Sequence, residues 1–258
     1  MNQNYLKVFI VAIAAVLLTS ISAYASETDS RIESSAKQSY VFKTYLNHDA
    51  INIQSVDGVV TLTGTVAEES HKSLAKETVA NLPGVKSVDD KLVLKGDLPA
   101  ENSDGWIGIK VKTALLFHRS VNAFKTEVDV KDGVITLKGE ASSQAQKDLA
   151  GEYAKDVDGV KDVKNEMTLV KVPSNKGQTL MEKIDDASIT AQVKVALLFH
   201  RSTSAISTNV ATSYGVVTVS GVAKNDAEKT LVSKLVNDIK GVTSVVNNMT
   251  IEDSSPKN

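Results

Sequence analysis

The sequence predicts an α+β fold made of three tandem αββαβ domains, each a small mixed sheet with two helices packed on one face. Three observations predict it. A glycine-bounded pattern recurs three times at offsets of 75 and 82 residues. Alternating apolar residues around its first glycine are typical of a β-hairpin, and apolar stripes with helical spacing flank that hairpin. We expect the domains to cover residues 31–96, 104–171 and 186–253, here called copies one, two and three.

Residues 1–25 are expected to be a secretory signal peptide. Lys7 precedes an uninterrupted apolar run over residues 8–18, and the Ala-Tyr-Ala segment at 23–25 offers a cleavage site before Ser26. A run of eleven residues is shorter than the roughly 20 that span a bilayer, so a permanent anchor is the less favoured alternative. We therefore expect a mature chain without a transmembrane segment, exported to the periplasm.

In copy two the first helix is predicted from Ile107, Val111, Ala114 and Leu115, which form one apolar helical stripe. The segment VKTALLFHRS at 111–120 recurs as VKVALLFHRS at 193–202. In copy one, KTYL at 43–46 is matched with KTAL at 112–115. That alignment predicts a helix-to-strand loop six residues shorter in copy one than in copy two.

The hairpin that follows is the most regular element of each copy. DGVVTLTG at 57–64 is matched without a gap by residues 132–139 and 214–221. In copy two, residues 126, 128 and 130 alternate on one strand and residues 135 and 137 on its partner, with a glycine at the turn. The glycines that keep the repeat spacing are assigned structural roles: Gly58, Gly64, Gly84, Gly133, Gly139, Gly159, Gly215, Gly221 and Gly241.

A second helix and a closing strand complete each copy. Capping boxes are expected at Ser143 with Gln146 and at Asn225 with Glu228, whereas copy one has Glu68 at the equivalent position and lacks the cap. Gly84, Gly159 and Gly241 are interpreted as left-handed caps at the ends of these helices. The closing strands are predicted at Val88 to Leu94, Val163 to Val170 and Val245 to Ile251.

The two linkers differ in length and composition. Residues 96–103 are short and polar, whereas residues 172–185 are longer and contain Pro173, Ser174 and Gly177. Since a longer polar linker restrains its neighbours less, copies one and two are expected to be more tightly coupled to each other than to copy three.

Composition excludes several classes of function. The chain has no cysteine, so a disulfide framework, a thiolate metal site and a thiol nucleophile are excluded. A net charge of -2 argues against a nucleic-acid binder. No repeated constellation places His48, His71, His118 or His200 near acidic and hydroxyl residues, and no nucleotide-binding glycine motif is present. We therefore expect no catalytic residues, no cofactor and no metal.

The motif GVVTLxG, a helix and then GVxxV resembles the BON family of bacterial osmotically inducible and nodulation proteins, over about 66 residues in each copy. The resemblance implies an αββαβ fold and an association with phospholipid surfaces in the cell envelope, often under osmotic or envelope stress. It implies no catalytic activity.

The first helices of copies two and three carry apolar residues beyond one core stripe. Aromatic and aliphatic side chains flanked by basic residues suit a phospholipid headgroup boundary. The candidate lipid-binding residues are Trp106, Ile109, Lys112, Leu116, Phe117, Arg119, Lys194, Leu198, Phe199 and Arg201. Packing between copies is an equally weighted interpretation of the same residues.

The expected partner is an anionic phospholipid surface, bound peripherally, in support of envelope integrity under osmotic stress. Each copy is electrically neutral, so any attraction to lipid must be local. A periplasmic chaperone or protein-interaction module, acting on envelope or unfolded client proteins, is the alternative. Binding of cell-wall glycan has little support, since aromatic residues make up only 5% of the chain.

Overall fold

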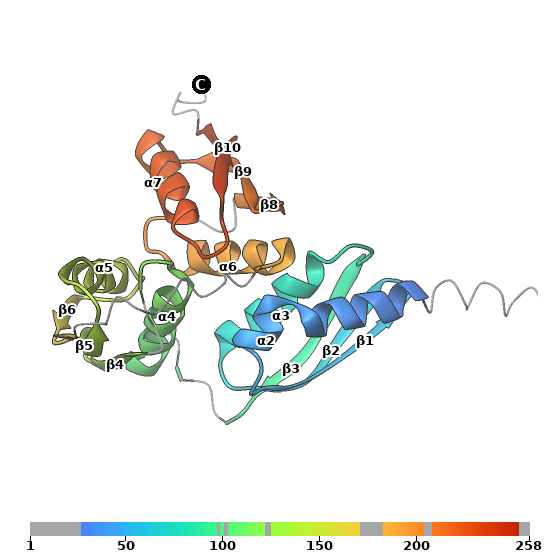
Figure 1. Ribbon diagram of the computed structural model, residues 1–258, viewed down its shortest axis with the longest axis horizontal. Coiled ribbons are helices and arrows are strands. Elements are labelled where there is room, and N and C mark those ends of the chain that lie inside the picture. Colours follow the sequence, from blue (N-terminus) through green and yellow to red (C-terminus); the bar gives the residue numbers. More distant parts are fainter. Residues whose placement is uncertain are drawn as a thin grey trace, which may run out of the picture.

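A computed structural model describes residues 27–96, 99–100, 103–121, 125–170, 183–203 and 208–252 (Figure 1). The predicted signal peptide and most of the predicted linker before copy three lie outside the described residues.

Each copy has the predicted αββαβ order. Copy one contains a helix over residues 27–38, α2 (Tyr40–Thr44), β1 (Ala50–Val56), β2 (Val59–Val66), α3 (Glu69–Ala80) and β3 (Ser87–Leu94). Copy two contains α4 (Asp104–Phe117), β4 (Thr126–Lys131), β5 (Val134–Ala141), α5 (Gln144–Lys155), β6 (Asp162–Asn165) and β7 (Thr168–Leu169). Copy three contains α6 (Asp186–Phe199), β8 (Thr208–Ser213), β9 (Val216–Ala223), α7 (Asp226–Asn237), β10 (Ser244–Asn247) and β11 (Thr250–Ile251).

The sheets are mixed, as predicted, because the second helix of each copy connects two parallel strands. In copy one, β1 pairs antiparallel with β2, and β2 pairs parallel with β3. Copies two and three repeat this order around β5 and β9, with the closing strand divided in two. Asn165 is the last residue of β6, and at this division its side chain donates to Lys147 O at 2.6 Å and accepts from Met167 N at 3.3 Å.

The hairpin turns are held by an aspartate that the sequence reading overlooked. In copy two, Asp132 and Gly133 both have positive φ, 54° and 78°, as a type I′ turn requires. The Asp104 carboxylate, in the first turn of α4, accepts hydrogen bonds from both of their N–H groups at 2.7 and 2.8 Å. Asp29 and Asp186 make the same pair of bonds in the other copies. This bond pair ties the first helix to the hairpin in every copy.

One group of repeated glycines occupies a position that was not predicted, and another lies elsewhere than expected. Gly139 and its equivalents lie inside the second strand, where a Cβ on Gly139 would be 2.0 Å from Lys125 O of the neighbouring chain segment. Gly159 has the expected positive φ, but it follows the end of α5 by four residues, so it is not the helix cap. A Cβ on Gly159 would be 3.1 Å from Ile107, because the first helix packs closely there. The two predicted N-caps are confirmed, because Ser143 and Asn225 accept from the N–H groups of residues 146 and 228. The reciprocal bonds of the capping boxes are shifted by one residue: the Gln146 and Glu228 side chains accept from the N–H groups of Ser142 and Lys224.

The helix-to-strand loop is shorter in copy one, but by three residues and not by the predicted six: five residues separate α2 from β1, and eight separate α4 from β4. The aspartates that hold the hairpin turns, Asp29, Asp104 and Asp186, keep the offsets of 75 and 82, so the first helices align without a gap. In copy one this helix is interrupted at Ser39, whose hydroxyl accepts from Phe42 N at the start of α2. The local match between residues 43–46 and 112–115 is therefore not a structural equivalence.

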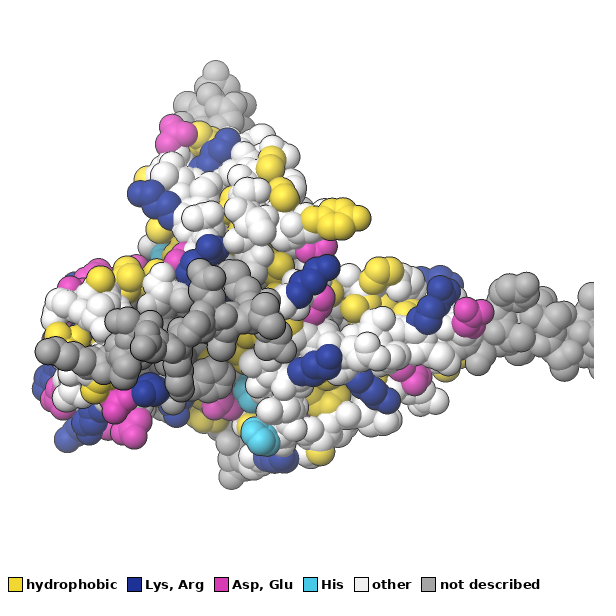
Figure 2. All heavy atoms as spheres, in the orientation of Figure 1, with side chains coloured by type: hydrophobic (Ala, Val, Ile, Leu, Met, Phe, Trp, Pro, Cys, Tyr) yellow, Lys and Arg dark blue, Asp and Glu magenta, His cyan; other side chains and the backbone are white. Residues whose placement is uncertain are grey.

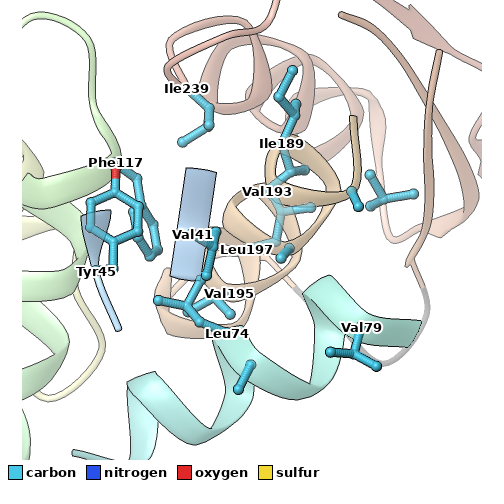
Figure 3. Close-up of a cluster of buried hydrophobic side chains, with 14 of the residues drawn as sticks. Val41, Tyr45, Leu74, Val79, Phe117, Ile189, Val193, Val195, Leu197 and Ile239 are labelled. Atoms are coloured by element: carbon cyan, nitrogen blue, oxygen red, sulfur yellow. The ribbon is translucent and has the colours of Figure 1, made fainter. Parts of the chain in front are cut away.

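The expected tighter coupling of copies one and two is also wrong. One hydrophobic core runs from copy one into copy three, where α3 packs along α6, while copy two has a core of its own (Figure 1). Figure 3 shows Leu74 of α3 beside Val195 of α6, with Val79 farther along α3 in the same core. Linker length limits how far copies can separate, but complementary apolar faces decide which of them pack together.

Acidification should weaken the hydrogen bonds that the Asp29 carboxylate accepts from the hairpin turn of copy one, here called the Asp29 clamp. The Ser55 hydroxyl, at 2.6 Å, and the Gly58 N–H lower the pKa of the Asp29 carboxyl from its ordinary value. A carboxyl with a depressed folded-state pKa stabilises the fold above its unfolded pKa of about 3.9 and loses that contribution as the pH falls through the folded value.

Asp29→Asn should therefore lower the free energy of unfolding at pH 7 and flatten its pH dependence below about pH 4. Urea unfolding between pH 2 and pH 7 measures both effects. Asp57→Asn, in the same turn, is the control because only the Asp57 backbone N–H takes part in the clamp. Identical pH profiles for wild type and Asp29→Asn would contradict the interpretation.

Candidate functional site

Helix α6 joins copy three to copy one through polar contacts as well as apolar ones. Asp185, the N-cap of α6, accepts from Tyr40 N at 2.7 Å, and the Ser188 hydroxyl accepts from Val41 N at 3.1 Å. These bonds satisfy the first N–H groups of α2, which would otherwise lack partners. Lys194 forms an ion pair with Glu77 of α3 at 2.8 Å. Lys194, predicted as a lipid contact, is thus committed to the neighbouring copy.

Two arginines at equivalent positions, Arg119 and Arg201, join copies two and three. We call this pair of contacts the reciprocal clasp. The Arg119 guanidinium donates to the carbonyls of Ile239 and Val242 at 3.1 and 2.9 Å, and also to Asn237 O. The Arg201 guanidinium donates to Val157 O and Val160 O at 3.2 and 3.0 Å, and also to Lys155 O. Each arginine therefore satisfies the last carbonyl of the other copy's second helix and two carbonyls of the turn that follows it.

Backbone hydrogen bonds strengthen the clasp on both sides. Lys240 N donates to Phe117 O at 3.0 Å, and Asp158 N donates to Phe199 O at 3.1 Å. The Phe117 side chain is fully buried and lies 5.6 Å, between ring centroids, from Tyr45 of copy one (Figure 3). Phe199 is also buried. In this arrangement neither phenylalanine reaches the surface, which agrees with packing between copies.

His118 takes part in a buried polar network between copies two and three. Its Nδ1 lies 2.9 Å from Asp238 Oδ2, and its ring stacks on Tyr153 with centroids 3.6 Å apart. The Tyr153 hydroxyl donates to the same carboxylate. Burial and the Asp238 charge raise the pKa of Tyr153, so it remains a hydrogen-bond donor. Burial opposes ionisation of Asp238, but the hydrogen bonds from His118 and Tyr153 outweigh it and lower the Asp238 pKa.

His200, at the equivalent position, has a different environment. Its Nδ1 accepts from Ser202 N at 3.1 Å, and its buried Nε2 makes no hydrogen bond within the described part of the chain. Asp156 lies 3.9 Å from that Nε2, beyond hydrogen-bond distance. Burial, assisted by the nearby Arg201 and His118, outweighs the attraction of Asp156 and lowers the pKa of His200. This histidine is therefore held neutral.

The other predicted lipid contacts remain partly or wholly exposed. Trp106, Ile109 and Leu116 are half-buried along α4, and Lys112 on the same helix is exposed. Leu198 is 50% exposed. Basic and acidic side chains are interspersed over the face seen in Figure 2, in keeping with three neutral copies. The structure therefore divides the predicted set into residues that join copies and residues left at the surface.

Two further findings concern the whole described chain. Among the residues described, no helix is both long and apolar enough to cross a membrane. Within the same residues, no three histidine or acidic side chains converge as metal ligands would.

Three segments of the chain match the BON domain, over residues 28–96, 103–171 and 185–253. These spans include most of the sequence. The chain belongs to the BON-domain family. This BON protein is 34% identical over 143 residues to Osmotically-inducible protein Y of Escherichia coli (strain K12), a match that covers 54% of this chain and 71% of the relative.

A second relative of this BON protein is "Uncharacterized protein in gshII 5'region" of Anaplasma centrale. The two are 28% identical over 151 residues, covering 58% of this chain and 96% of that one. Among solved structures, CdsD, a structural protein of the type III secretion system of Chlamydia trachomatis, is 16% identical with a TM-score of 0.25, covering 83% of this chain and 91% of that one. A similarity at that level does not bear on function.

Removal of one clasp arginine should weaken docking of copies two and three. Arg119→Ala leaves the last carbonyl of α7 and two carbonyls of the following turn without their charged donor, at a cost of about 2 kcal/mol, typical of hydrogen bonds with a charged group. Hydrogen exchange at Lys240 N–H, bonded to Phe117 O, should therefore be faster. Arg201→Ala should do the same at Asp158 N–H. The control is Arg31→Ala, at an exposed arginine of copy one. Unchanged hydrogen exchange in the two clasp variants would contradict a role of the clasp in docking.

Mild acid should also loosen this docking through His200. A base whose pKa is depressed in the folded state binds more protons when undocked, so docking is fully stable above its ordinary pKa of about 6.5 and weakens as the pH falls below it. His200→Gln cannot titrate and should remove that part of the pH dependence. Hydrogen exchange at Asp158 N–H between pH 5 and pH 8, corrected for intrinsic rates, tests this, with His48→Gln at an exposed site as control. If hydrogen exchange in His200→Gln had the same pH dependence as in wild type, this role of His200 would be refuted.

Proposed function

We propose that this BON protein is a non-enzymatic periplasmic protein that associates peripherally with anionic phospholipid surfaces and supports the envelope under osmotic stress. Its similarity to an osmotically inducible relative supports the link to osmotic stress. The signal-like first 25 residues support export.

The exposed stripe of α4 is the observation that carries this proposal. Trp106, Ile109 and Leu116 follow one another at helical spacing and stay only half-buried after the copies have docked, with Lys112 beside them in solvent. A half-buried tryptophan with aliphatic neighbours and a basic side chain suits the boundary between headgroups and acyl chains. Because each copy is neutral, the attraction comes from Lys112 and its immediate surroundings.

A non-catalytic role is supported by what the histidines do. His71 is paired with Asp49 and His118 with Asp238, while His200 is enclosed at the clasp. His48 is exposed and contributes its backbone carbonyl to a contact with Lys95. These side chains serve to hold helices and copies together.

A protein-interaction role is the second candidate, favoured by the outer face of the sheet in copy three. Val222 and Val246 are 48% and 44% exposed there. The outward residues of β8, β9 and β10 include no charged side chain, whereas Glu127, Asp129 and Lys138 are exposed on the corresponding face of copy two. An uncharged sheet face of this kind fits contact with another protein better than contact with anionic lipid.

Vesicle flotation tests the lipid proposal. Trp106→Ala with Ile109→Ala should reduce binding to vesicles containing anionic lipid about tenfold, because apolar area at the interface is lost. Wild type should bind vesicles of neutral lipid more weakly than anionic ones. The control is Leu169→Ala, a 55% exposed leucine of β7 that lies outside the stripe and the predicted lipid contacts.

Indifference of wild type to anionic vesicles would contradict the lipid proposal. Suppressed aggregation of an unfolded client, together with that indifference, would favour the second candidate. Phe117→Ala is unsuitable for this experiment because a fully buried side chain reports on packing between copies.

A further inference from the structure

A cleft between copies one and two has features that neither the fold nor the clasp explains. It measures about 210 Å³ and lies between the start of α3 and the side of α4 with β4. Leu74, Leu115, Leu116 and Val128 supply apolar lining. Glu68, His71 and Lys112 add charged and polar groups.

The polar groups of the cleft are positioned for a ligand with two opposite charges. His71 is held by Asp49, whose Oδ2 lies 2.6 Å from Nδ1, so Nε2 is the ring nitrogen available to a ligand. Asp49 is itself fixed by the Ala67 N–H at 2.8 Å.

Lys112 is exposed, and the Glu68 carboxylate accepts from the Ser70 hydroxyl at 3.3 Å. Lys138, helped by Lys112, lowers the pKa of Asp129. Neither Lys112 nor Glu68 forms an ion pair within the described residues.

The charges in the cleft indicate which polar group of a ligand would fit there. A ligand that is only anionic would be repelled by Glu68, and one that is only cationic would be repelled by Lys112. A zwitterion with a phosphate and an ammonium group satisfies both. The phosphate lies beside Lys112, and the ammonium lies beside Glu68 and Nε2 of His71, which is the accepting nitrogen of the neutral ring because Nδ1 donates to Asp49.

The volume of the cleft and the apolar stripe next to it indicate what the remainder of the ligand is like. At 210 Å³ the cleft is smaller than the roughly 300–1,000 Å³ of sites that enclose a whole ligand, so it admits only part of one. Leu116 lines the cleft and also begins the exposed α4 stripe that continues to Ile109 and Trp106. From residue 116 to residue 106 an α-helix rises about 15 Å, which is half of a bilayer's 30 Å hydrocarbon core and hence the depth of one leaflet.

We propose that this cleft binds a zwitterionic single-chain phospholipid of the lysophosphatidylethanolamine type. The headgroup and first methylenes occupy the cleft, and the acyl chain runs outward along the α4 stripe. The proposal rests on the proposed function, because it assigns to the same stripe a specific lipid class.

Calorimetric titration of the full mature chain, with lysolipids below their micelle-forming concentrations, tests the proposal. Lysophosphatidylethanolamine should bind about tenfold more tightly than lysophosphatidylglycerol of the same chain length, because Glu68 disfavours a headgroup without the ammonium. Glycerophosphoethanolamine, which has the headgroup and no acyl chain, should bind at least about tenfold more weakly, since the apolar lining is then unused.

Charge reversal gives the sharpest comparison. Glu68→Lys should invert the preference toward lysophosphatidylglycerol. Glu69→Lys makes the same change in net charge at the next residue, outside the cleft, and should keep the wild-type preference. Leu116→Ser should weaken binding of lysophosphatidylethanolamine, whereas Leu169→Ser, at an exposed leucine outside the cleft, should not.

Equal affinity for the two lysolipids, or an unchanged preference in Glu68→Lys, would overturn the proposal. So would equal binding of the headgroup without its chain. In each case flotation of wild type with anionic vesicles would still support the proposed function, so failure of the cleft and failure of surface association are distinguishable.

Discussion

Burial of helix α6 is the constraint on which the arrangement of the three copies depends. A unit of about 65 residues buries only about 60% of its unfolded surface and is marginal alone. In α6 nearly every side chain from Ala187 to Leu197 is buried, against copy three on one side and α3 of copy one on the other. One continuous core thus stabilises two sheets far apart in the sequence. Copy two, which keeps its own core, is joined by the insertion of Phe117 and by the clasp.

The reciprocal clasp follows from repetition itself. Because copies two and three carry the same LLFHRS segment and end their second helices alike, each supplies the arginine that the other needs. This is the logic of a symmetric dimer, in which one surface is complementary to itself. Copy one has Lys43 and Thr44 where copy two has His118 and Arg119, so it cannot take part. Its helix instead breaks at Ser39, and the N–H groups of α2 are satisfied by Asp185 and Ser188 of copy three.

Much of the fold could be predicted from the sequence because its signals are local. Strand alternation, capping residues and glycine spacing each depend on a few neighbouring residues, and the structure confirms the αββαβ order from them. The aspartate clamp was also within reach, since Asp29, Asp104 and Asp186 keep the repeat offsets. The packing of the copies against one another could not be predicted from the sequence. It depends on whether Phe117 or Arg119 meets lipid or protein, and an apolar side chain beside a basic one has the same pattern in both settings.

Docking of the copies sorts the first helices into different roles. In copy three, Phe199, Arg201 and Lys194 are all committed to neighbouring copies, so α6 has become part of the scaffold. In copy two, only the C-terminal end of α4 is committed, because Phe117 and Arg119 both lie there. The opposite end of α4 keeps Trp106 and Ile109 at the surface, backed by a rigid assembly. A helix anchored at one end and partly exposed at the other can present its apolar stripe without the entropy cost of ordering a free segment. Under the proposed function, the third copy acts through the reciprocal clasp, which holds copy two at the end of α4 opposite the Trp106 end of the stripe.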